Sequence, residues 1–460
     1  MDKPARTMET ATITIAIHGL NRKNPPLLTP QPHLILDNHH YYFPVAFEPW
    51  LSGRKKAFRQ RGKGHTKSLE NLKHWLQKYD LTWPHREVVF ISDLHADADA
   101  LIASLVATGL VEYKEKESLF KLTKQGKQTL FVFGGDFFDK GPSNLELLLA
   151  LKAFISSGAN IRLLAGNHDI RVLFGMYQAG KVNDLKNSHF FVRMGAKALP
   201  FVKEIYCRYF DKTHAKELLS DKKALQQLMP HEHWEKKFPE LAKDALSSQA
   251  IANELRKIAK KSEAFVEQCD AHDIRPAEVL WATQKWQSLF LSQNGEFNWF
   301  YKKMRLATRQ GSFLFVHAGF DDAAAKIFEE HGVGRVNKLF RKQLRLSPFD
   351  FYYGEIANII RTKYRTVDKP LTNVGAKCMH RAGIHVIVHG HRNLHSGQRI
   401  AMRKDIMHIE CDVTMDSGSR KKEGLKGAGA GATLIKLDRK ILGISTDYPK
   451  IKVFEPDRLD

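Results

Sequence analysis

The stretch LFVFGGDFFDKG, residues 130–141, decides the fold, because it joins a strand pattern to a set of chemically active side chains. Its first four residues are all apolar, as is typical of a strand that is buried on both faces. Two glycines follow where the chain must turn sharply, and Asp136, Asp139 and Lys140 come after them. The stretch therefore predicts a buried strand that delivers two carboxylates and a basic side chain to the end of a sheet.

Four further segments repeat this arrangement along the chain. Each is a short, largely apolar run that ends in polar residues or glycines. The expected strands are 87–92, 160–165, 312–316 and 385–388, and helices are expected at 98–108 and 144–156. This alternation predicts an α/β fold whose sheet is mostly parallel at its centre and covered by helices. Two later runs, 406–411 and 432–437, are expected to complete the sheet.

The ends of the expected strands share one chemistry. They carry aspartate, histidine and asparagine in the motifs SDLH (92–95), GNHD (166–169), VHAG (316–319) and VHGHRN (388–393). In a parallel sheet the carboxyl ends of the strands open at one edge, so these side chains are expected to meet there. Carboxylates with imidazoles and one amide oxygen suit a pair of divalent ions such as Mn²⁺, Fe or Zn²⁺, whereas Ca²⁺ prefers oxygen ligands alone.

The expected ligands divide between two ions. Asp93 and His95 are two positions apart on an extended segment, project to the same side and can hold one ion together. Asp136 can bridge both ions with its two oxygens. The second ion is completed by Asn167, His317 and His391. Because such a pair of ions neutralises phosphoryl oxygens and activates water, the expected reaction is in-line hydrolysis of a phosphate ester.

The series of motifs resembles the calcineurin-like metallophosphoesterase superfamily, and the form GD-x-x-D-x-G at 135–141 is similar to its phosphoprotein phosphatase (PPP-type) branch. The resemblance implies a β-sandwich of two mixed sheets flanked by helices. It implies the same metal ligands, namely Asp93, His95 and Asp136 for the first ion and Asp136, Asn167, His317 and His391 for the second. It also implies that His168 is the general acid and that Asp139 holds it, since a carboxylate fixes the tautomer of an imidazole.

Three basic residues beside these motifs are candidate substrate-binding residues. Lys140 stands where the PPP-type branch has an arginine that grips phosphate, and it keeps the charge without the bidentate fork. Arg171 and Arg392 each adjoin a ligand motif, and a guanidinium matches the geometry of phosphate. The alternative for both is an arginine on the surface or at a helix end. Residues 417–422, which include three basic side chains, are expected either to face the substrate or to lead into the last strand.

Composition divides the chain into several parts. Residues 1–80 are expected to form an N-terminal β-rich appendage with a basic linker, for which a solvated loop is the alternative. The metallophosphoesterase core is expected at 87–175 and 311–440. A helical cap is expected at 176–310, where strand patterns give way to amphipathic helices, and residues 441–460 form a C-terminal extension.

The overall composition sets the class of protein. Hydrophobic residues make up 43% of the 460, which excludes a disordered or collagen-like chain. The formal charge of +22 favours anionic partners such as phosphorylated molecules or nucleic acid. Four scattered cysteines predict a protein without disulfides. No signal peptide and no apolar run of membrane-spanning length is recognised, so the expected location is the cytoplasm.

Three functions are compatible with these features. The first is a dinuclear metal-dependent phosphatase for phosphate monoesters, including phosphoserine and phosphothreonine in proteins, with Mn²⁺ as the expected metal. The second is a hydrolase of nucleotides or dinucleoside polyphosphates, because a basic helical cap could close over a small polyanion. The third is a basic protein that binds nucleic acid or a partner through counterion release and keeps a vestigial metal site.

Overall fold

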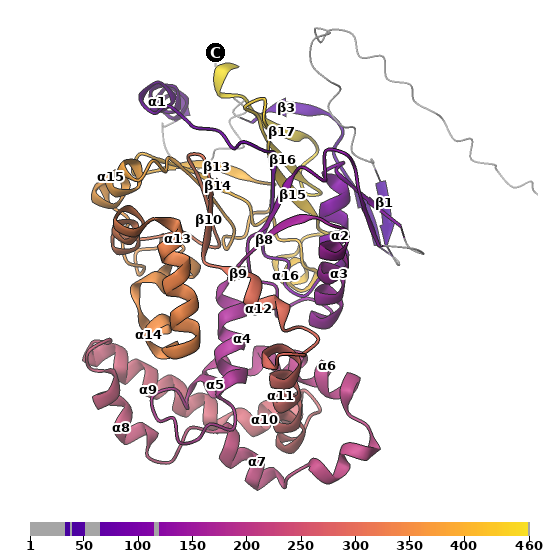
Figure 1. Ribbon diagram of the computed structural model, residues 1–460, viewed down its shortest axis with the longest axis vertical. Helices are drawn as coiled ribbons and strands as arrows, with labels where there is room; N and C mark the ends of the chain where they lie inside the picture. The colour runs from indigo at the N-terminus through magenta and orange to yellow at the C-terminus, as the bar shows by residue number, and fades with distance from the viewer. Residues whose placement is uncertain (1–32, 37–38, 51–64, 115–118, 459–460) are drawn as a thin grey trace, which may run out of the picture.

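The computed structural model describes residues 33–36, 39–50, 65–114 and 119–458. Of the expected N-terminal appendage, residues 1–32, 37–38 and 51–64, which include most of the basic linker, lie outside the described residues. Within them, the chain forms two mixed β-sheets that pack face to face, with helices on the outer faces and a further group of helices at one end (Figure 1). This arrangement is a β-sandwich flanked by helices, as the motifs imply.

The larger sheet holds the first three motifs. Its order is β3 (Phe47–Pro49), β17 (Ile451–Phe454), β16 (Ile441–Ser445), β15 (Gly431–Ile435), β4 (Val88–Ile91), β7 (Leu130–Phe133), β8 (Asn160–Leu164) and β9 (Met304–Arg305). The last four of these strands run parallel to one another, whereas β15 and β16 are antiparallel to their neighbours. The motif-bearing strands therefore end at the same edge.

The smaller sheet holds the last two motifs. Its order is β10 (Ala307–Gln310), β11 (Phe313–Val316), β12 (Val386–His389), β14 (Ile406–Glu410) and β13 (Arg399–Arg403). The three central strands are parallel, and the two edge strands are antiparallel to them. Two hairpins lie apart from both sheets: β1 (His33–Leu36) with β2 (His39–Tyr42), and β5 (Val111–Tyr113) with β6 (Phe120–Leu122).

Side chains of alternate residues fill the space between the sheets. Val88 and Phe90 of β4 pack against the smaller sheet, where the rings of Phe90 and Phe315 lie 5.9 Å apart. Val89 and Ile91 belong instead to the core beneath the helices α2 (Ala98–Ala107) and α3 (Asn144–Ser156). This alternation follows the two-residue period of a strand. Helices α13 (Asp322–Leu346) and α15 (Asn373–Arg381) lie on the side of the smaller sheet (Figure 1).

The group of helices at one end comes from a single stretch of chain between β8 and β9. Its members are α4 (Asn167–Gln178), α5 (Phe190–Met194), η1 (Ala196–Ala198), α6 (Leu199–Tyr209), η2 (Lys212–Glu217), α7 (Asp221–Leu228), α8 (Trp234–Ala242), α9 (Ser248–Glu263), α10 (Phe265–Ala271), α11 (Pro276–Leu291) and α12 (Trp299–Lys303). Helix α4 runs from the edge of the sheet into this group and joins it to the sandwich (Figure 1). We refer to α5 to α11 as the helical insertion.

The remaining helices are α1 (His65–Lys78), α14 (Pro348–Tyr353), η3 (Glu355–Ile360), α16 (Ser417–Glu423) and η4 (Pro456–Arg458). The expected strands match the observed ones to within two residues at each end. The four cysteines are free. None of the helices in the described ranges combines the length and apolar character that crossing a membrane requires.

Candidate metal centre

The predicted metal ligands converge where the motif-bearing strands end and α4 begins. The ligand atoms of Asp93, Asp136, His317 and His391 all lie within 4.8 Å of one another, and all four residues are buried. Asn167 joins them, because its Oδ1 atom lies 3.3 Å from Nε2 of His317. Side chains from five separate strand ends therefore surround one point, which we call the metal centre.

His95 reaches the same centre, and backbone strain marks the loops that carry these residues. Nε2 of His95 lies 3.7 Å from Oδ2 of Asp136. Six predicted site residues have φ angles between 44° and 74°, namely Asp93, His95, Asp136, Asp139, Lys140 and His391. A residue other than glycine in such a conformation costs of order 1–3 kcal/mol, and it persists only where its surroundings enforce it. The loops are therefore strained into the turns that aim these side chains.

A buried carboxylate that was not predicted, that of Asp169, holds the loop of Asp136 in place. It accepts hydrogen bonds of 2.8–2.9 Å from the backbone N–H groups of Gly166, Asp136 and Phe137. Asp136 in turn accepts a hydrogen bond of 2.9 Å from the backbone N–H of His168. A Cβ atom on Gly166 would lie 2.2 Å from the backbone N of Asp136, so only glycine fits there. The second and third motifs are thereby locked together.

Backbone carbonyl groups determine which nitrogen of each imidazole carries a proton. Nδ1 of His317 donates to the carbonyl oxygen of Gly134 at 2.7 Å, and Nε2 of His391 donates to that of Arg361 at 3.2 Å. A carbonyl oxygen can only accept, so each ring, in its neutral form, keeps a lone pair on its other nitrogen. These two nitrogens, Nε2 of His317 and Nδ1 of His391, lie 3.1 Å apart.

The centre therefore brings several acceptor atoms close together. Oδ1 of Asp136 lies 3.4 Å from Nε2 of His317, and Oδ1 of Asn167 lies 3.3 Å from the same atom. Lone pairs packed this closely repel one another unless a cation lies among them. A carboxylate, an amide oxygen and two imidazoles are donors that suit a divalent transition metal. The residues present thus fit a metal ion.

His95 offers a further ring nitrogen with a lone pair for a metal ion. Its Nδ1 atom donates to the carbonyl oxygen of Phe138 at 3.1 Å, which leaves the lone pair on Nε2. The ammonium group of Lys140 donates to this Nε2 atom at 2.6 Å. A positive charge thus lies against the nitrogen that is predicted to bind the first ion.

Burial and neighbouring charges favour the protonation states that metal ligands need. Burial lowers the pKa of His391 well below its usual value, and burial together with Lys140 does the same for the pKa of His95. Burial alone would raise the pKa of Asp136, but a proton on a neighbouring imidazole, on that of His317 foremost, would hold this pKa well below its usual range. Neutral imidazoles and an ionised carboxylate are the forms that coordinate a metal.

His168 and Asp139, predicted as the acid and its holder, are in contact. Nδ1 of His168 lies 2.8 Å from Oδ2 of Asp139, and Nε2 of His168 lies 3.9 Å from Oδ2 of Asp136. With Nδ1 donating to Asp139, Nε2 is the nitrogen that faces the metal centre. The carboxylate of Asp139 also accepts a hydrogen bond from Arg171.

The three basic residues predicted to bind substrate all contact other side chains of the protein. Lys140 contacts His95, and Arg171 contacts Asp139, so both lie at the metal centre. Arg392 donates instead to Oε1 of Glu410 at 3.0 Å. The structure therefore brings two of the three to the centre and places Arg392 beside a carboxylate at the end of β14.

Glu204, on α6 of the helical insertion, was not predicted either. It accepts hydrogen bonds from the backbone N–H groups of Asn144 and Leu145 at 2.9 and 3.0 Å, and from the side chain of Asn144 at 3.1 Å. Oδ1 of Asn144 in turn accepts from the backbone N–H of Asp139 at 3.1 Å. Glu204 therefore holds the start of α3 and, through Asn144, the residue that contacts His168.

The basic segment 417–422 forms most of α16 and lies next to the metal centre. Asp416 caps this helix by accepting a hydrogen bond of 2.7 Å from the backbone N–H of Ser419. A Cβ atom on Gly418 would lie 2.1 Å from the carbonyl oxygen of Lys140, so the start of α16 packs directly on the loop after β7. Lys421 and Lys422 on this helix are exposed.

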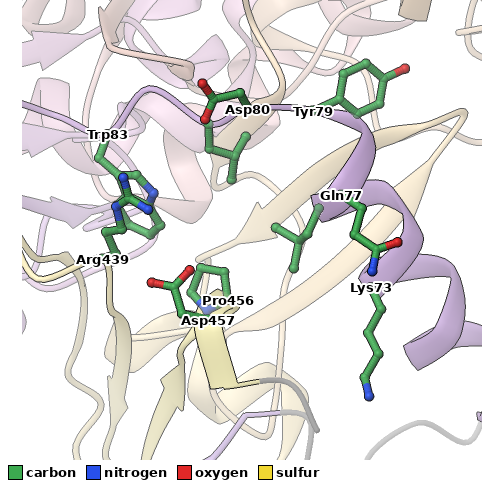
Figure 2. Close-up of a pocket in the computed structure, with 10 residues that line it drawn as sticks. Lys73, Gln77, Tyr79, Asp80, Trp83, Arg439, Pro456 and Asp457 are labelled. Carbon is green, nitrogen blue, oxygen red and sulfur yellow. The ribbon is translucent and has the colours of Figure 1, made fainter.

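A hollow of about 440 Å³ lies between α1, with the residues that follow it, and the C-terminal helix η4 (Figure 2). Its lining includes two acidic residues, Asp80 and Asp457, and two basic residues, Lys73 and Arg439. The residues that line it include none of the predicted site residues. The hollow is therefore separate from the metal centre.

Part of the chain is similar to known phosphoesterases. Residues 87–262 match the family of calcineurin-like phosphoesterases. The serine/threonine-protein phosphatase with EF-hands 2 of Mus musculus is 26% identical over 162 residues, which are 33% of this chain and 19% of that protein. The match thus spans about a fifth of the length of this curated relative.

Solved structures with a similar chain path include two phosphatases. A cold-active protein-tyrosine phosphatase of a psychrophilic Shewanella species is 14% identical, with 84% of each chain covered and a TM-score of 0.42. A protein serine/threonine phosphatase from Saccharomyces cerevisiae is 11% identical, with 84% of this chain and 87% of that chain covered and a TM-score of 0.34.

Proposed function

Since residues 87–262 match the calcineurin-like phosphoesterases, we propose that this chain is a metal-dependent phosphatase that hydrolyses phosphate monoesters. One observation carries the proposal: ligand atoms of Asp93, Asp136, His317 and His391 lie within 4.8 Å of one another. A buried site that concentrates carboxylate and imidazole ligands binds divalent cations, and a pair of such cations binds a phosphoryl group.

The proximity of the side chains at the metal centre supports the proposed ligands. Asp93, His95 and Asp136 would hold the first ion. Asp136, Asn167, His317 and His391 would hold the second. Mn²⁺ is the proposed metal, with Fe and Zn²⁺ as alternatives. When bound, the ions supply positive charge for the phosphoryl oxygens and lower the pKa of water.

His168 is the proposed general acid. Its Nε2 atom faces the metal centre, while Nδ1 is held by Asp139 at 2.8 Å. In this orientation a protonated ring delivers the Nε2 proton to the leaving oxygen, and the carboxylate of Asp139 balances the charge of the ring. Lys140 and Arg171 lie close enough to offer positive charge to the phosphoryl oxygens.

Phosphoserine and phosphothreonine in proteins are the proposed substrates. The support comes from the mouse relative, which is named a serine/threonine-protein phosphatase. Nucleotides or dinucleoside polyphosphates are the second candidate. They are favoured by Lys197 of the helical insertion, which is exposed and lies within electrostatic reach of Lys140 and Arg171.

A substrate screen with Mn²⁺ tests the proposal. Phosphopeptides, nucleotides and dinucleoside polyphosphates are offered to the parent protein and to Asp136→Asn. We expect metal-dependent release of phosphate that the substitution abolishes. Absence of hydrolysis with every substrate, together with salt-dependent retention of nucleic acid that survives the substitution, would contradict the proposal and favour a binding protein.

The division of the chain into an N-terminal appendage, a core at 87–175 and 311–440, a helical cap at 176–310 and a C-terminal extension stays a prediction. So does the cytoplasmic location. Both are compatible with the proposed activity, and neither is needed for the chemistry at the metal centre.

A further inference from the structure

Three arginines surround one buried carboxylate in the smaller sheet. The side chain of Glu410, at the end of β14, is 0% exposed. Arg392 donates to its Oε1 atom at 3.0 Å, Arg399 donates to Oε2 through Nε at 2.6 Å, and Arg403 also contacts Oε1. The arginine side chains are 24–39% exposed. The guanidinium groups therefore lie between the carboxylate and the solvent.

Glu410 cannot satisfy the charge or the donors of this arginine cluster. All the ion pairs that Arg392, Arg399 and Arg403 form within the described part of the chain go to Glu410, so two positive charges are left over. Each guanidinium has five N–H donors, whereas one carboxylate offers about four acceptor positions. The buried Nε atom of Arg403 has no hydrogen-bond partner among the described residues.

The arginine cluster is held in a fixed arrangement. The buried carboxylate of Glu410 forms an ion pair with each of the three guanidinium groups. The guanidinium of Arg403 also lies over the ring of Tyr364, 4.9 Å from its centroid. A cluster held in this way loses little side-chain entropy when an anion binds to it.

Sheet register places the arginine cluster near the edge that carries the metal centre. Arg399 pairs with Glu410 across β13 and β14, and Glu410 pairs with His389 across β14 and β12. His389 is the last residue of β12 and stands two positions before His391. Since adjacent strands lie about 4.8 Å apart, the backbone of Arg399 is about 10 Å from the strand that leads to the metal centre.

We propose that Arg392, Arg399 and Arg403 form a subsite for a second anionic group of the substrate. The group is a carboxylate or a phosphate on a phosphopeptide, about three residues from the phosphate that is hydrolysed. Three extended residues span about 10 Å, which is comparable to the distance from the backbone of Arg399 to the strand that leads to the metal centre. Guanidinium groups bind either anion through paired hydrogen bonds. The inference rests on the proposed function, because it requires phosphopeptides to be hydrolysed at the metal centre.

Synthetic phosphoserine peptides test this subsite. One pair of peptides carries Glu or Gln three residues before the phosphoserine, another pair carries Glu or Gln three residues after it, and a third set carries a second phosphoserine at the same places. The measured quantity is the ratio of kcat/KM for the acidic and neutral peptides. We expect a ratio of about ten for the better placement, the effect of one charge-assisted hydrogen bond.

Substitutions then assign the ratio to the arginine cluster. Arg399→Gln is expected to bring the ratio close to one. Arg399→Lys, which keeps the charge and loses the fork, is expected to restore part of it and serves as the second variant if Arg399→Gln fails to fold. Arg341→Gln removes the same charge from an exposed position on α13 and is expected to leave the ratio unchanged.

The outcomes separate this inference from the proposed function. Suppose that the parent protein hydrolyses p-nitrophenyl phosphate with Mn²⁺. The subsite proposal is then wrong if kcat/KM is the same for acidic and neutral peptides, or if no peptide is hydrolysed. A ratio that survives Arg399→Gln also overturns it. If the parent protein hydrolyses no phosphate ester at all, the failure belongs to the proposed function.

Discussion

The imidazole of His168 and the carboxylate of Asp139 lie 2.8 Å apart, measured from Nδ1 to Oδ2, and both residues are buried. This contact leaves Nε2 as the nitrogen that faces Asp136 and the other residues of the metal centre. A proton that leaves the ring toward the substrate must therefore leave from Nε2. The orientation of the His168 ring therefore supports its proposed role as the proton donor to the leaving oxygen.

Replacement of His168 tests this role through the leaving group. We expect His168→Ala to lower kcat by about 10²–10⁴-fold for phosphoserine peptides, whose leaving oxygen needs a proton. The loss for p-nitrophenyl phosphate should be much smaller, because nitrophenolate leaves without protonation. Steady-state kinetics with both substrates measures the difference. Equal losses on the two substrates would contradict the acid role.

Replacement of Asp136 tests the shared ligand. Asp136→Asn is expected to lower kcat by several orders of magnitude on every substrate, because it removes the one carboxylate that both ions are proposed to share. Circular dichroism should show an unchanged fold. The exposed surface variant Asp244→Asn is the matched control and should keep its activity. An active Asp136→Asn protein would rule out a bridging role.

Glu204 tests whether the helical insertion supports the site. Glu204→Gln removes the charge that accepts the N–H groups of Asn144 and Leu145. We expect the free energy of unfolding to fall by about 1–3 kcal/mol, the cost of weakening hydrogen bonds to a partly buried charged group. Unfolding in urea measures it. Glu240→Gln, at an exposed position on α8, should change it little, and an equal loss in both variants would contradict the role of Glu204.

The buried histidine His189 predicts a loss of stability in acid. Burial, with a contribution from Arg193, lowers its pKa from 6.5 to about 3. Between these values the unfolded chain binds a proton that the folded chain does not. Above pH 6.5, His189 therefore does not reduce the free energy of unfolding. As the pH drops from 6.5 toward 3, His189 lowers the free energy of unfolding by up to about 1.4 kcal/mol per pH unit.

Urea unfolding of variants between pH 7.5 and 5 checks this contribution. We expect the free energy of unfolding of His189→Gln to depend less steeply on pH than that of the parent protein, because the variant takes up as much as one proton fewer when it unfolds. His331→Gln, at an exposed position, should keep the slope of the parent. An unchanged slope in His189→Gln would contradict the assignment.

Much of the fold and of the metal centre could be predicted because the signals are local. The motif-bearing strands are largely apolar runs, and the ligands of the centre follow them within a few residues, so strand and ligand are found together in the sequence. Asp169 had a local signal as well, since it is the third residue of a helix that begins at a glycine turn, but its role in holding Asp136 depends on the fold.

The residues that escaped prediction act across long stretches of chain. Glu204 contacts Asn144, which is sixty positions away in the sequence, and the sequence around Glu204 does not indicate this contact. Arg392 stays a predicted substrate-binding residue, and its contact with Glu410 could not be predicted because it depends on the pairing of β12 with β14. Helix ends in the insertion were also less predictable. They depend on single residues: Ser220 caps the start of α7, and Ala264 separates α9 from α10.

Metal stoichiometry tests the central claim most directly. The purified protein is loaded with Mn²⁺, dialysed and analysed for bound metal per chain, and Asp136→Asn is treated in the same way. The account predicts two Mn²⁺ ions per chain in the parent protein and loss of bound metal in the variant, with anomalous scattering between Asp93, Asp136, His317 and His391 in crystals of the loaded protein. A parent protein that retains no divalent metal, or retains it equally well after the substitution, would contradict the account.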